Sequence, residues 1–359
     1  MRRALVSLTL TVLLVPAAPA LADPSPEPSP TDPAPTQPAP TDPAYVPADD
    51  GGSIAAAKQV DAQTIDLTID TPLVDSSDPK IRLYTPAGWS RTSTAAWPIV
   101  YVYGGGPGSY TEWAGNSDLA ATAKRSRALV ALVDGGKAQG FTDWYNGGQG
   151  GNPRWETFHT QEVIQLLERN FRASANRAVM GISSGGQGAL TYASRHPGLF
   201  KFAACFSSLL HITAPGLPEA MMFTDYARPE PTVPDPLAKW GNPATDRRNW
   251  LDHDPYEQAE GLRGTRLFVS AGDGTQGPLD EDLGKLIEKN GLNGLQIYTE
   301  GAVSEALVAT TTADFLDRLG KLGIPVTTDL YGPGFHQWKY WNREYKKAWP
   351  LIMEAIGAA

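Results

Sequence analysis

Two short apolar runs constrain the fold of this chain more than any other feature. Residues 98–103 read Pro-Ile-Val-Tyr-Val-Tyr and residues 128–133 read Ala-Leu-Val-Ala-Leu-Val, and glycines follow both runs closely. Runs of this length without polar alternation are typical of central parallel strands, which helices cover on both faces. We therefore expect a mostly parallel sheet with helices on both sides.

Further segments extend this pattern along the chain. We predict more central strands at residues 177–181, 202–206, 266–271 and 326–331, and helices at 160–171, at 187–196 and in a segment that ends near residue 322. Residues 64–71 and 80–84 alternate apolar and polar side chains, which predicts half-buried strands at a sheet edge. Strands that alternate with helices indicate an α/β domain with right-handed crossovers.

One long segment breaks this alternation. Residues 211–262, between the sixth and seventh predicted strands, are rich in proline, methionine and tryptophan and lack sheet periodicity. This insertion could cap or flank a functional site, or it could be a packed excursion that contacts no ligand. We expect a single catalytic domain that spans residues 53–359.

The N-terminal region predicts export. Two arginines precede an apolar run over residues 4–15, and the small-residue sequence Ala20-Leu21-Ala22 follows. This arrangement is typical of a signal peptide over residues 1–22. The rival interpretation, a membrane anchor, requires a longer apolar run of about 20 residues.

Proline recurs at every second or third position after the predicted signal peptide. Such a composition favours an extended, hydrated segment without a core, so we expect a linker over residues 23–52. The linker could hold the catalytic domain at a surface such as the cell wall, or it could serve only solubility. The protein is expected to be secreted, and to be extracellular or cell-wall associated.

Net charge limits the binding partners of the chain, and its cysteine content limits its covalent cross-links. The formal net charge of -9 argues against nucleic acid or anionic lipid bound by charge alone. Cys205 is the single cysteine, so no intrachain disulfide can form, and its apolar neighbours indicate a buried thiol. Neutral or apolar ligands remain compatible with this charge.

The sequence Gly181-Ile182-Ser183-Ser184-Gly185 lies between a predicted strand and a predicted helix. In that context a Gly-x-Ser-x-Gly motif forms a tight turn, which leaves no space for side chains beside the serine and lifts its hydroxyl clear of the sheet. The helix N-terminus favours negative charge that develops there. Ser183 is therefore the predicted nucleophile.

A serine hydroxyl needs a base within hydrogen-bond reach. Of the five histidines, His159 precedes the serine, His196 ends the helix that follows it, and His211 and His253 lie in the insertion. His336 remains, in a glycine-rich loop directly after the last predicted strand, where a fold of this kind carries its general base.

The chain order of serine, acid and histidine requires an acid between residues 183 and 336. Asp273 follows a predicted strand, which is the commonest position for the acid, whereas Glu300 and Glu305 lie ahead of a later helix. Periodicity leaves all three open, and each could instead be a solvated or helix-start carboxylate.

Two backbone amides are predicted to bind the negatively charged oxygen of a tetrahedral intermediate. One belongs to Ser184, directly after the nucleophile, and the other to the run Gly104-Gly105-Gly106-Pro107. We choose Gly106 because Pro107 has no N–H. A plain tight turn is the alternative for these glycines.

Several separated motifs follow one another along the chain. They are Thr142-Asp143-Trp144-Tyr145, Arg154-Trp155-Glu156-Thr157-Phe158, the Ser183 turn, Trp240-Gly241 and His336-Gln337-Trp338. With these motifs the chain resembles the mycolyltransferases of the antigen 85 complex and related esterase D-type hydrolases, over most of residues 75–350. The resemblance implies the α/β-hydrolase fold, a Ser-His-Glu triad without a metal or organic cofactor, and an acyl-enzyme that passes its acyl group to water or to a sugar hydroxyl. It favours Glu305 as the acid, because the spacing of 31 residues to His336 matches that family.

The loop after the third of the eight predicted strands departs from this family. The mycolyltransferases carry Asp-Gly-Leu-Arg there, with charged residues that help to hold trehalose, whereas this chain has Gly104-Gly105-Gly106-Pro107. Gln337 also replaces a usual serine, although Trp338 is retained.

Three functions are compatible with these features. The leading hypothesis is a secreted carboxylic ester hydrolase for a small-molecule or glycolipid ester, and the second is a cell-envelope acyltransferase similar to trehalose O-mycolyltransferases. In either enzyme we expect Trp144 and Trp338 to contact substrate. The third is a non-catalytic glycan-binding protein that uses Trp113, Trp144 and Trp338 as exposed aromatic residues.

Overall fold

The computed structural model describes residues 44–74, 78–106, 108–136, 141–226 and 235–359, with the side chains of 224–226 left out. The predicted signal peptide and the linker up to residue 43 lie outside the described residues. Within the described part of the chain, no helix is long and apolar enough to cross a membrane.

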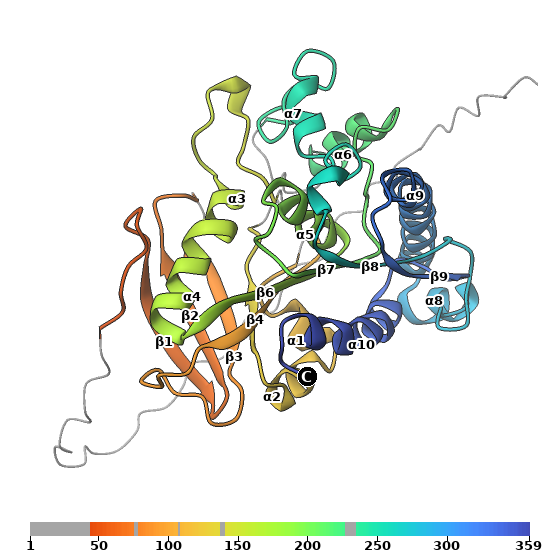
Figure 1. Ribbon diagram of the computed structural model, residues 1–359. Helices are drawn as coiled ribbons and strands as arrows, with labels where there is room; N and C mark the ends of the chain where they lie inside the picture. The colour runs from red at the N-terminus through yellow and green to blue at the C-terminus, as the bar shows by residue number, and fades with distance from the viewer. Residues whose placement is uncertain (1–43, 75–77, 107, 137–140, 227–234) are drawn as a thin grey trace, which may run out of the picture. The chain divides into compact units, whose positions relative to one another are not determined.

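One nine-stranded sheet organises residues 45–359, in the order β1-β2-β3-β5-β4-β6-β7-β8-β9 (Figure 1). The strands are β1 (Ser53–Asp61), β2 (Thr64–Asp70), β3 (Lys80–Tyr84), β4 (Trp97–Tyr103), β5 (Leu129–Val133), β6 (Ala173–Ile182), β7 (Phe202–Phe206), β8 (Arg266–Gly272) and β9 (Thr327–Gly332). Strands β4 to β9 run parallel, and β1, β2 and β3 form an antiparallel edge. This confirms the predicted mostly parallel α/β sheet.

Strand β1 is the one described strand that the sequence pattern did not predict. Most of its residues are exposed, so it lacks the apolar alternation of a half-buried strand. It pairs antiparallel with β2 through the short turn between Asp61 and Thr64. Pairing to a neighbouring strand, rather than burial of its own side chains, makes this segment a strand.

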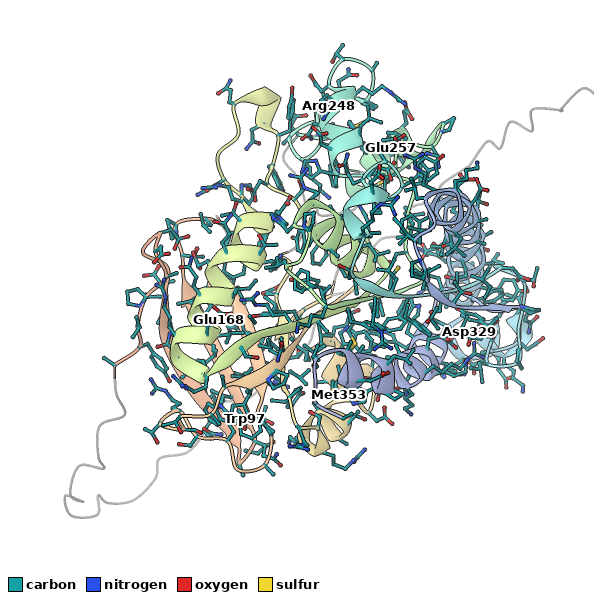
Figure 2. All side chains as sticks on the ribbon, viewed as in Figure 1. Trp97, Glu168, Arg248, Glu257, Asp329 and Met353 are labelled. Atoms are coloured by element: carbon teal, nitrogen blue, oxygen red, sulfur yellow. The ribbon has the colours of Figure 1, made fainter. Side chains whose placement is uncertain are left out.

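Helices cover both faces of the sheet (Figure 1). Alternate residues of the central strands point to opposite layers: Tyr101 packs with α4 and α5, whereas Val100 and Val102 pack with α2 and α10. One layer contains α4 (Val163–Phe171), α5 (Ser183–Arg195) and α9 (Asn293–Leu322), and the other contains α1 (Glu112–Asn116), α2 (Leu119–Arg125) and α10 (Trp338–Ala355). Figure 2 shows side chains between the sheet and both layers, with Met353 of α10 on one side.

The remaining short elements lie in the connections. They are the 3-10 helices η1 (Asn146–Gly148) and η3 (Ala259–Leu262), the π-helix η2 (Phe158–Glu162), and α3 (Trp155–Thr157), α6 (Leu217–Tyr226), α7 (Arg247–Asp252) and α8 (Leu283–Asn290). The predicted helix over residues 160–171 is thus a π-turn followed by α4.

The insertion between β7 and β8 is a packed unit. Its apolar residues Ile212, Trp240 and Trp250 form a separate cluster. Its backbone also pairs with the segment after β5, where the Tyr145 N–H donates to the Lys239 carbonyl at 3.1 Å. These contacts support the interpretation of the insertion as a packed excursion. That the insertion caps or flanks the site stays a prediction.

The folded domain includes residues that precede the predicted boundary at residue 53. Val46 exchanges two hydrogen bonds with the Asn170 side chain, at 2.7 and 2.8 Å, and the Tyr45 ring stacks on Phe171. Asp49 forms an ion pair with Arg169. Residues 45–52 therefore belong to the folded domain, because α4 supplies partners that composition does not reveal.

Candidate active site

Ser183 lies on a strained turn between β6 and α5. Its φ angle is 51°, in the left-handed region, and α5 begins at this residue, four positions before the predicted start of the helix. A Cβ atom on Gly185 would lie 2.2 Å from the Gly104 carbonyl oxygen, and one on Gly181 would lie 2.3 Å from the Gly185 backbone. Both flanking positions therefore require glycine.

A hydrogen-bonded chain joins three residues that are distant in sequence. His336 Nε2 lies 3.0 Å from Ser183 Oγ, and His336 Nδ1 lies 2.8 Å from Glu305 Oε2. With the imidazole proton on Nδ1, donated to the carboxylate, Nε2 presents a lone pair to the serine hydroxyl. This arrangement can accept the serine proton as the hydroxyl attacks an electrophile.

The Glu305 carboxylate is fully buried in α9, and hydrogen bonds compensate its burial. Its Oε1 accepts from Ser207 Oγ at 2.7 Å, from the Gly272 N–H at 2.7 Å and from the Tyr331 hydroxyl at 3.2 Å. Burial raises the pKa of Tyr331, so that hydroxyl keeps its proton. Oε2 remains directed at His336.

Ser207, Gly272 and Tyr331 were not predicted from the sequence. They lie at or near the carboxyl ends of β7, β8 and β9, which meet at one edge of the parallel sheet. Position at a strand end is the signal that could have indicated them. Ser207 also has a positive φ angle of 51°.

The other two candidate acids face different partners. Asp273 is exposed and accepts from the Thr275 backbone at 2.8 Å, and Glu300 is exposed and accepts from Gln296 at 2.7 Å. Of the three carboxylates, Glu305 is the one that the structure places against His336.

The remaining histidines have other partners. His159 is buried between Tyr192 and the Asp134 carbonyl, His196 and His253 lie beside Glu156, and His211 pairs with Asp314. Burial lowers the pKa of His159 to about 4. Elimination by position in the sequence therefore agrees with the structure.

The loop after β4 packs directly against the serine turn. A Cβ atom on Gly105 would lie 3.3 Å from Ser183 Cβ. Gly106 follows in an exposed turn, and Ser184 is the second residue of α5. Pro107 lies outside the described residues. Gly105, the neighbour of Gly106, thus lies beside the nucleophile, and the role of the Gly106 and Ser184 amides stays a prediction.

The predicted substrate-binding tryptophans lie in packed positions. Trp144 is 7% exposed and belongs to the core cluster on the α4 and α5 side. Trp338 is half-buried and packs edge-on against Trp113 and Trp341, and the Trp341 ring contacts His336. Trp113 is buried and donates to the Tyr103 carbonyl at 3.0 Å. Packing, rather than display to a ligand, accounts for Trp144 and Trp113.

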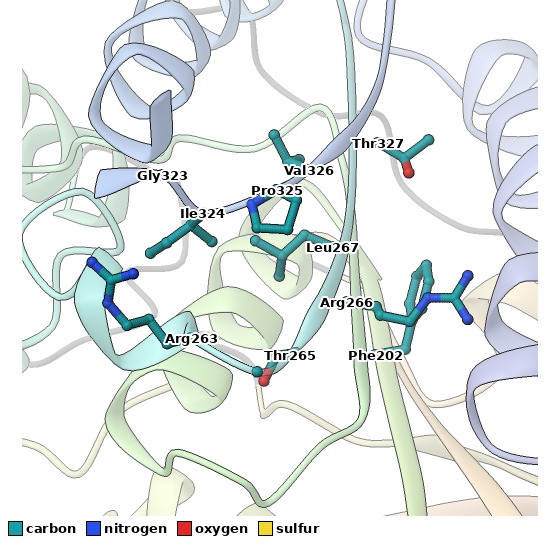
Figure 3. A pocket seen from close by; sticks show the side chains of 11 residues that line it. Phe202, Arg263, Thr265, Arg266, Leu267, Gly323, Ile324, Pro325, Val326 and Thr327 are labelled. Carbon is teal, nitrogen blue, oxygen red and sulfur yellow. The ribbon is translucent and has the colours of Figure 1, made fainter. Parts of the chain in front are cut away.

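A cavity of about 540 Å³ lies at the opposite edge of the sheet (Figure 3). Its lining includes Phe202, Arg266 and Thr327, the first residues of β7, β8 and β9. Arg266 pairs with Glu354 at 3.1 Å. Because parallel strands share one direction, this cavity is at the amino ends of the strands, away from Ser183.

Cys205, the single cysteine of the chain, is buried. Burial raises the pKa of Cys205 to about 12, so its thiol stays protonated. No group of three or more histidine, cysteine, aspartate or glutamate side chains in the described ranges is arranged to hold a metal ion.

The sheet order, with a serine turn directly after β6 and a histidine loop after β9, defines the α/β-hydrolase fold. A family model described as "Putative esterase" matches residues 76–350. The chain belongs to this esterase family, and it is an enzyme of the esterase or acyltransferase class.

Individual relatives represent both kinds of activity. The chain is 28% identical to the diacylglycerol acyltransferase/mycolyltransferase Ag85B of Mycobacterium intracellulare, over 73% of this chain and 76% of the relative. It is 26% identical to the esterase MT1326 of Mycobacterium tuberculosis, over 69% of this chain and 50% of the relative. The crystal structure of Mycobacterium tuberculosis MPT51 superposes with a TM-score of 0.63 at 20% identity, over 83% of this chain and 99% of that chain, and shows the shared fold.

Proposed function

We propose that the protein is a secreted carboxylic ester hydrolase that acts through an acyl-enzyme on Ser183. The observation that carries this proposal is the hydrogen-bonded chain from Ser183 through His336 to buried Glu305. His336 takes the serine proton as Oγ bonds to the ester carbonyl carbon, and it returns that proton to the leaving alcohol. Glu305 orients the imidazole and stabilises its protonated form.

The second half of the reaction uses the same groups. His336 removes a proton from water, the hydroxide bonds to the acyl carbon, and the ester bond to Ser183 Oγ breaks with return of the proton to Oγ. In both halves the Gly106 and Ser184 N–H groups donate to the negatively charged oxygen of the tetrahedral intermediate. The N-terminus of α5 adds a favourable dipole at that oxygen.

A fluorophosphonate probe tests the nucleophile. The wild-type enzyme should be labelled on Ser183, and Ser183→Ala should lose both labelling and ester hydrolysis. Labelling that persists in Ser183→Ala would place the nucleophile elsewhere. Unlabelled wild-type protein that binds glycan would instead support the non-catalytic alternative, although the burial of Trp113 and Trp144 argues against it.

Transfer to a cell-envelope sugar is the second candidate, and the mycolyltransferase relative favours it. The loop Gly104-Gly105-Gly106-Pro107 favours hydrolysis, because it has no charged side chain to hold a sugar. A panel of p-nitrophenyl esters of increasing chain length, with and without trehalose as acceptor, separates the two. Acyl-trehalose formed faster than free acid would overturn the hydrolase assignment.

Export through the predicted signal peptide and placement at the cell wall through the linker complete the proposal. The expected mature chain begins at Asp23. Intact-mass measurement of protein from the culture medium and from washed cell wall tests both points. A mass that retains residues 1–22 in a membrane fraction would support an anchor.

A further inference from the structure

A carboxyl group occupies the centre of the loop that faces the nucleophile. Glu112, the first residue of α1, accepts a hydrogen bond from the Gly105 N–H at 2.9 Å through Oε2. The same loop closes on itself, because the Gly108 N–H donates to the Gly105 carbonyl at 2.7 Å. The Glu112 side chain thus turns back from α1 into the loop.

The glycines around this carboxyl make room for it. A Cβ atom on Gly104 would lie 2.4 Å from Glu112 Oε2, with the next neighbour 3.6 Å away, and a Cβ atom on Gly108 would lie 1.9 Å from the same oxygen. The carboxyl therefore fills the space that side chains at these positions would take. The absence of side chains in this loop therefore leaves space for the Glu112 carboxyl as well as for the serine turn.

The contact extends from this carboxyl to the reaction centre. Gly105 donates its N–H to the Glu112 carboxyl, and a Cβ atom on Gly105 would lie 3.3 Å from Ser183 Cβ. Gly106, whose N–H is the predicted oxyanion donor, is the next residue. A shift of the Gly105 peptide would change the direction of the Gly106 N–H, to which hydrogen-bond strength is sensitive.

Burial raises the pKa of Glu112 to about 7, and the hydrogen bond from Gly105 opposes that rise. Asp118, two residues after the end of α1, is engaged by Lys346 at 2.7 Å. Both the ionised and the protonated carboxyl present an oxygen that can accept from Gly105.

We propose that Glu112 is a positioning residue that holds the Gly104–Gly106 backbone so that the Gly106 N–H points at the oxyanion. This inference rests on the proposed acyl-enzyme mechanism. It assigns to Glu112 a task in transition-state stabilisation that the Ser183, His336 and Glu305 chain does not perform.

The test compares Glu112→Ala and Glu112→Gln with the exposed α8 control Glu288→Gln. For each we would measure kcat and KM on a p-nitrophenyl ester, and Ki for a trifluoromethyl ketone that forms a tetrahedral adduct with serine. Glu112→Ala should lower kcat by about 30-fold and raise Ki by a similar factor, with KM within twofold, because loss of oxyanion alignment affects the charged adduct. Glu112→Gln keeps an acceptor and should recover to within threefold of wild type.

A double-mutant cycle distinguishes a specific coupling between Gly104 and Glu112 from a general loss of structure. Gly104→Ala places a methyl group against the Glu112 carboxyl and should weaken ketone binding strongly, whereas the same change in the Glu112→Ala background should add little. Additive effects, or an unchanged Ki in folded Glu112→Ala, would overturn the inference. Failure of the proposed function is distinguishable, because wild-type protein would then resist the fluorophosphonate probe.

Discussion

The two sides of the serine turn are supported in different ways. On the acid side, three donors from the ends of β7, β8 and β9 hold one oxygen of Glu305, and the other oxygen faces His336. The His336 backbone N–H is also bonded to the Gly301 carbonyl in α9, at 3.0 Å. Long-range contacts from the sheet and a thirty-residue helix define this side.

On the oxyanion side, a glycine loop is shaped by Glu112 from α1, a helix of five residues. Its contacts are local, between residues 104 and 112, and the loop meets the rest of the site at Gly105 and Gly104. Three hydrogen bonds support the Glu305 carboxylate, whereas one hydrogen bond joins Glu112 to the glycine loop. We therefore expect the acid side to tolerate the loss of one supporting hydrogen bond better than the oxyanion side does.

The largest expected effect is at Glu305 itself. Glu305→Gln keeps the shape but offers an amide, which can force the wrong imidazole tautomer, so kcat should fall by about 10³–10⁴-fold. Steady-state kinetics of Asp273→Asn and Glu300→Gln provide matched controls, and both should stay within twofold. A larger loss in Asp273→Asn would return the acid to the alternative position.

The donors to Glu305 should show redundancy. Ser207→Ala and Tyr331→Phe each remove one of the three donors, and each should lower kcat by about fivefold, because a hydrogen bond to a charged group contributes about 1.5–3 kcal/mol and the others partly compensate. The double variant should lose more than the product of the two. If either single change matched Glu305→Gln, the acid side would depend on one contact after all.

The pH dependence should report on Glu112. Since its pKa is raised to about 7 from 4.5, the protonated carboxyl is favoured by the fold, and this stability contribution is lost as pH rises through 7. Above pH 7 the ionised carboxylate also opposes the oxyanion, so wild-type kcat should fall about two- to threefold relative to Glu112→Gln.

The measurement is the ratio of wild-type to Glu112→Gln kcat from pH 6 to 9, in which pH effects common to both proteins cancel. Thermal unfolding of the two proteins at pH 5 and pH 8 gives the matching stability difference. A ratio that stays constant across pH 7 would show that Glu112 does not titrate there.

The smallest expected effect on activity lies far from the serine turn. Asn170→Ala removes two hydrogen bonds to Val46 and should lower the free energy of unfolding by about 1–2 kcal/mol. The kcat value should stay unchanged, because neither residue reaches the carboxyl ends of the strands. An unchanged unfolding free energy would mean that residues 45–52 add no stability to the domain.

Much of the fold could be predicted because its central strands are buried on both faces. The pattern of β7 matched the structure at both ends, since all its residues are buried, whereas β1 escaped prediction because its residues are mostly exposed. The folded domain begins about eight residues before the predicted end of the linker, for a related reason. Residues 45–52 are ordered by α4, and partners on another element leave no local trace in composition.

The strand–helix alternation, the Ser183 turn and the His336 loop could be predicted from the amino-acid sequence alone. Each depends on local backbone requirements: apolar runs, glycines without room for a Cβ, and a loop after a strand. The three-dimensional structure was needed to show which carboxylate faces His336, which tryptophans are buried, and that Glu112 turns into the loop beside Ser183. The Glu305 carboxylate, for example, accepts a hydrogen bond from Ser207, 98 residues earlier in the chain. The two residues meet because the sheet brings the carboxyl ends of its strands together, and such a contact leaves no local pattern in the sequence.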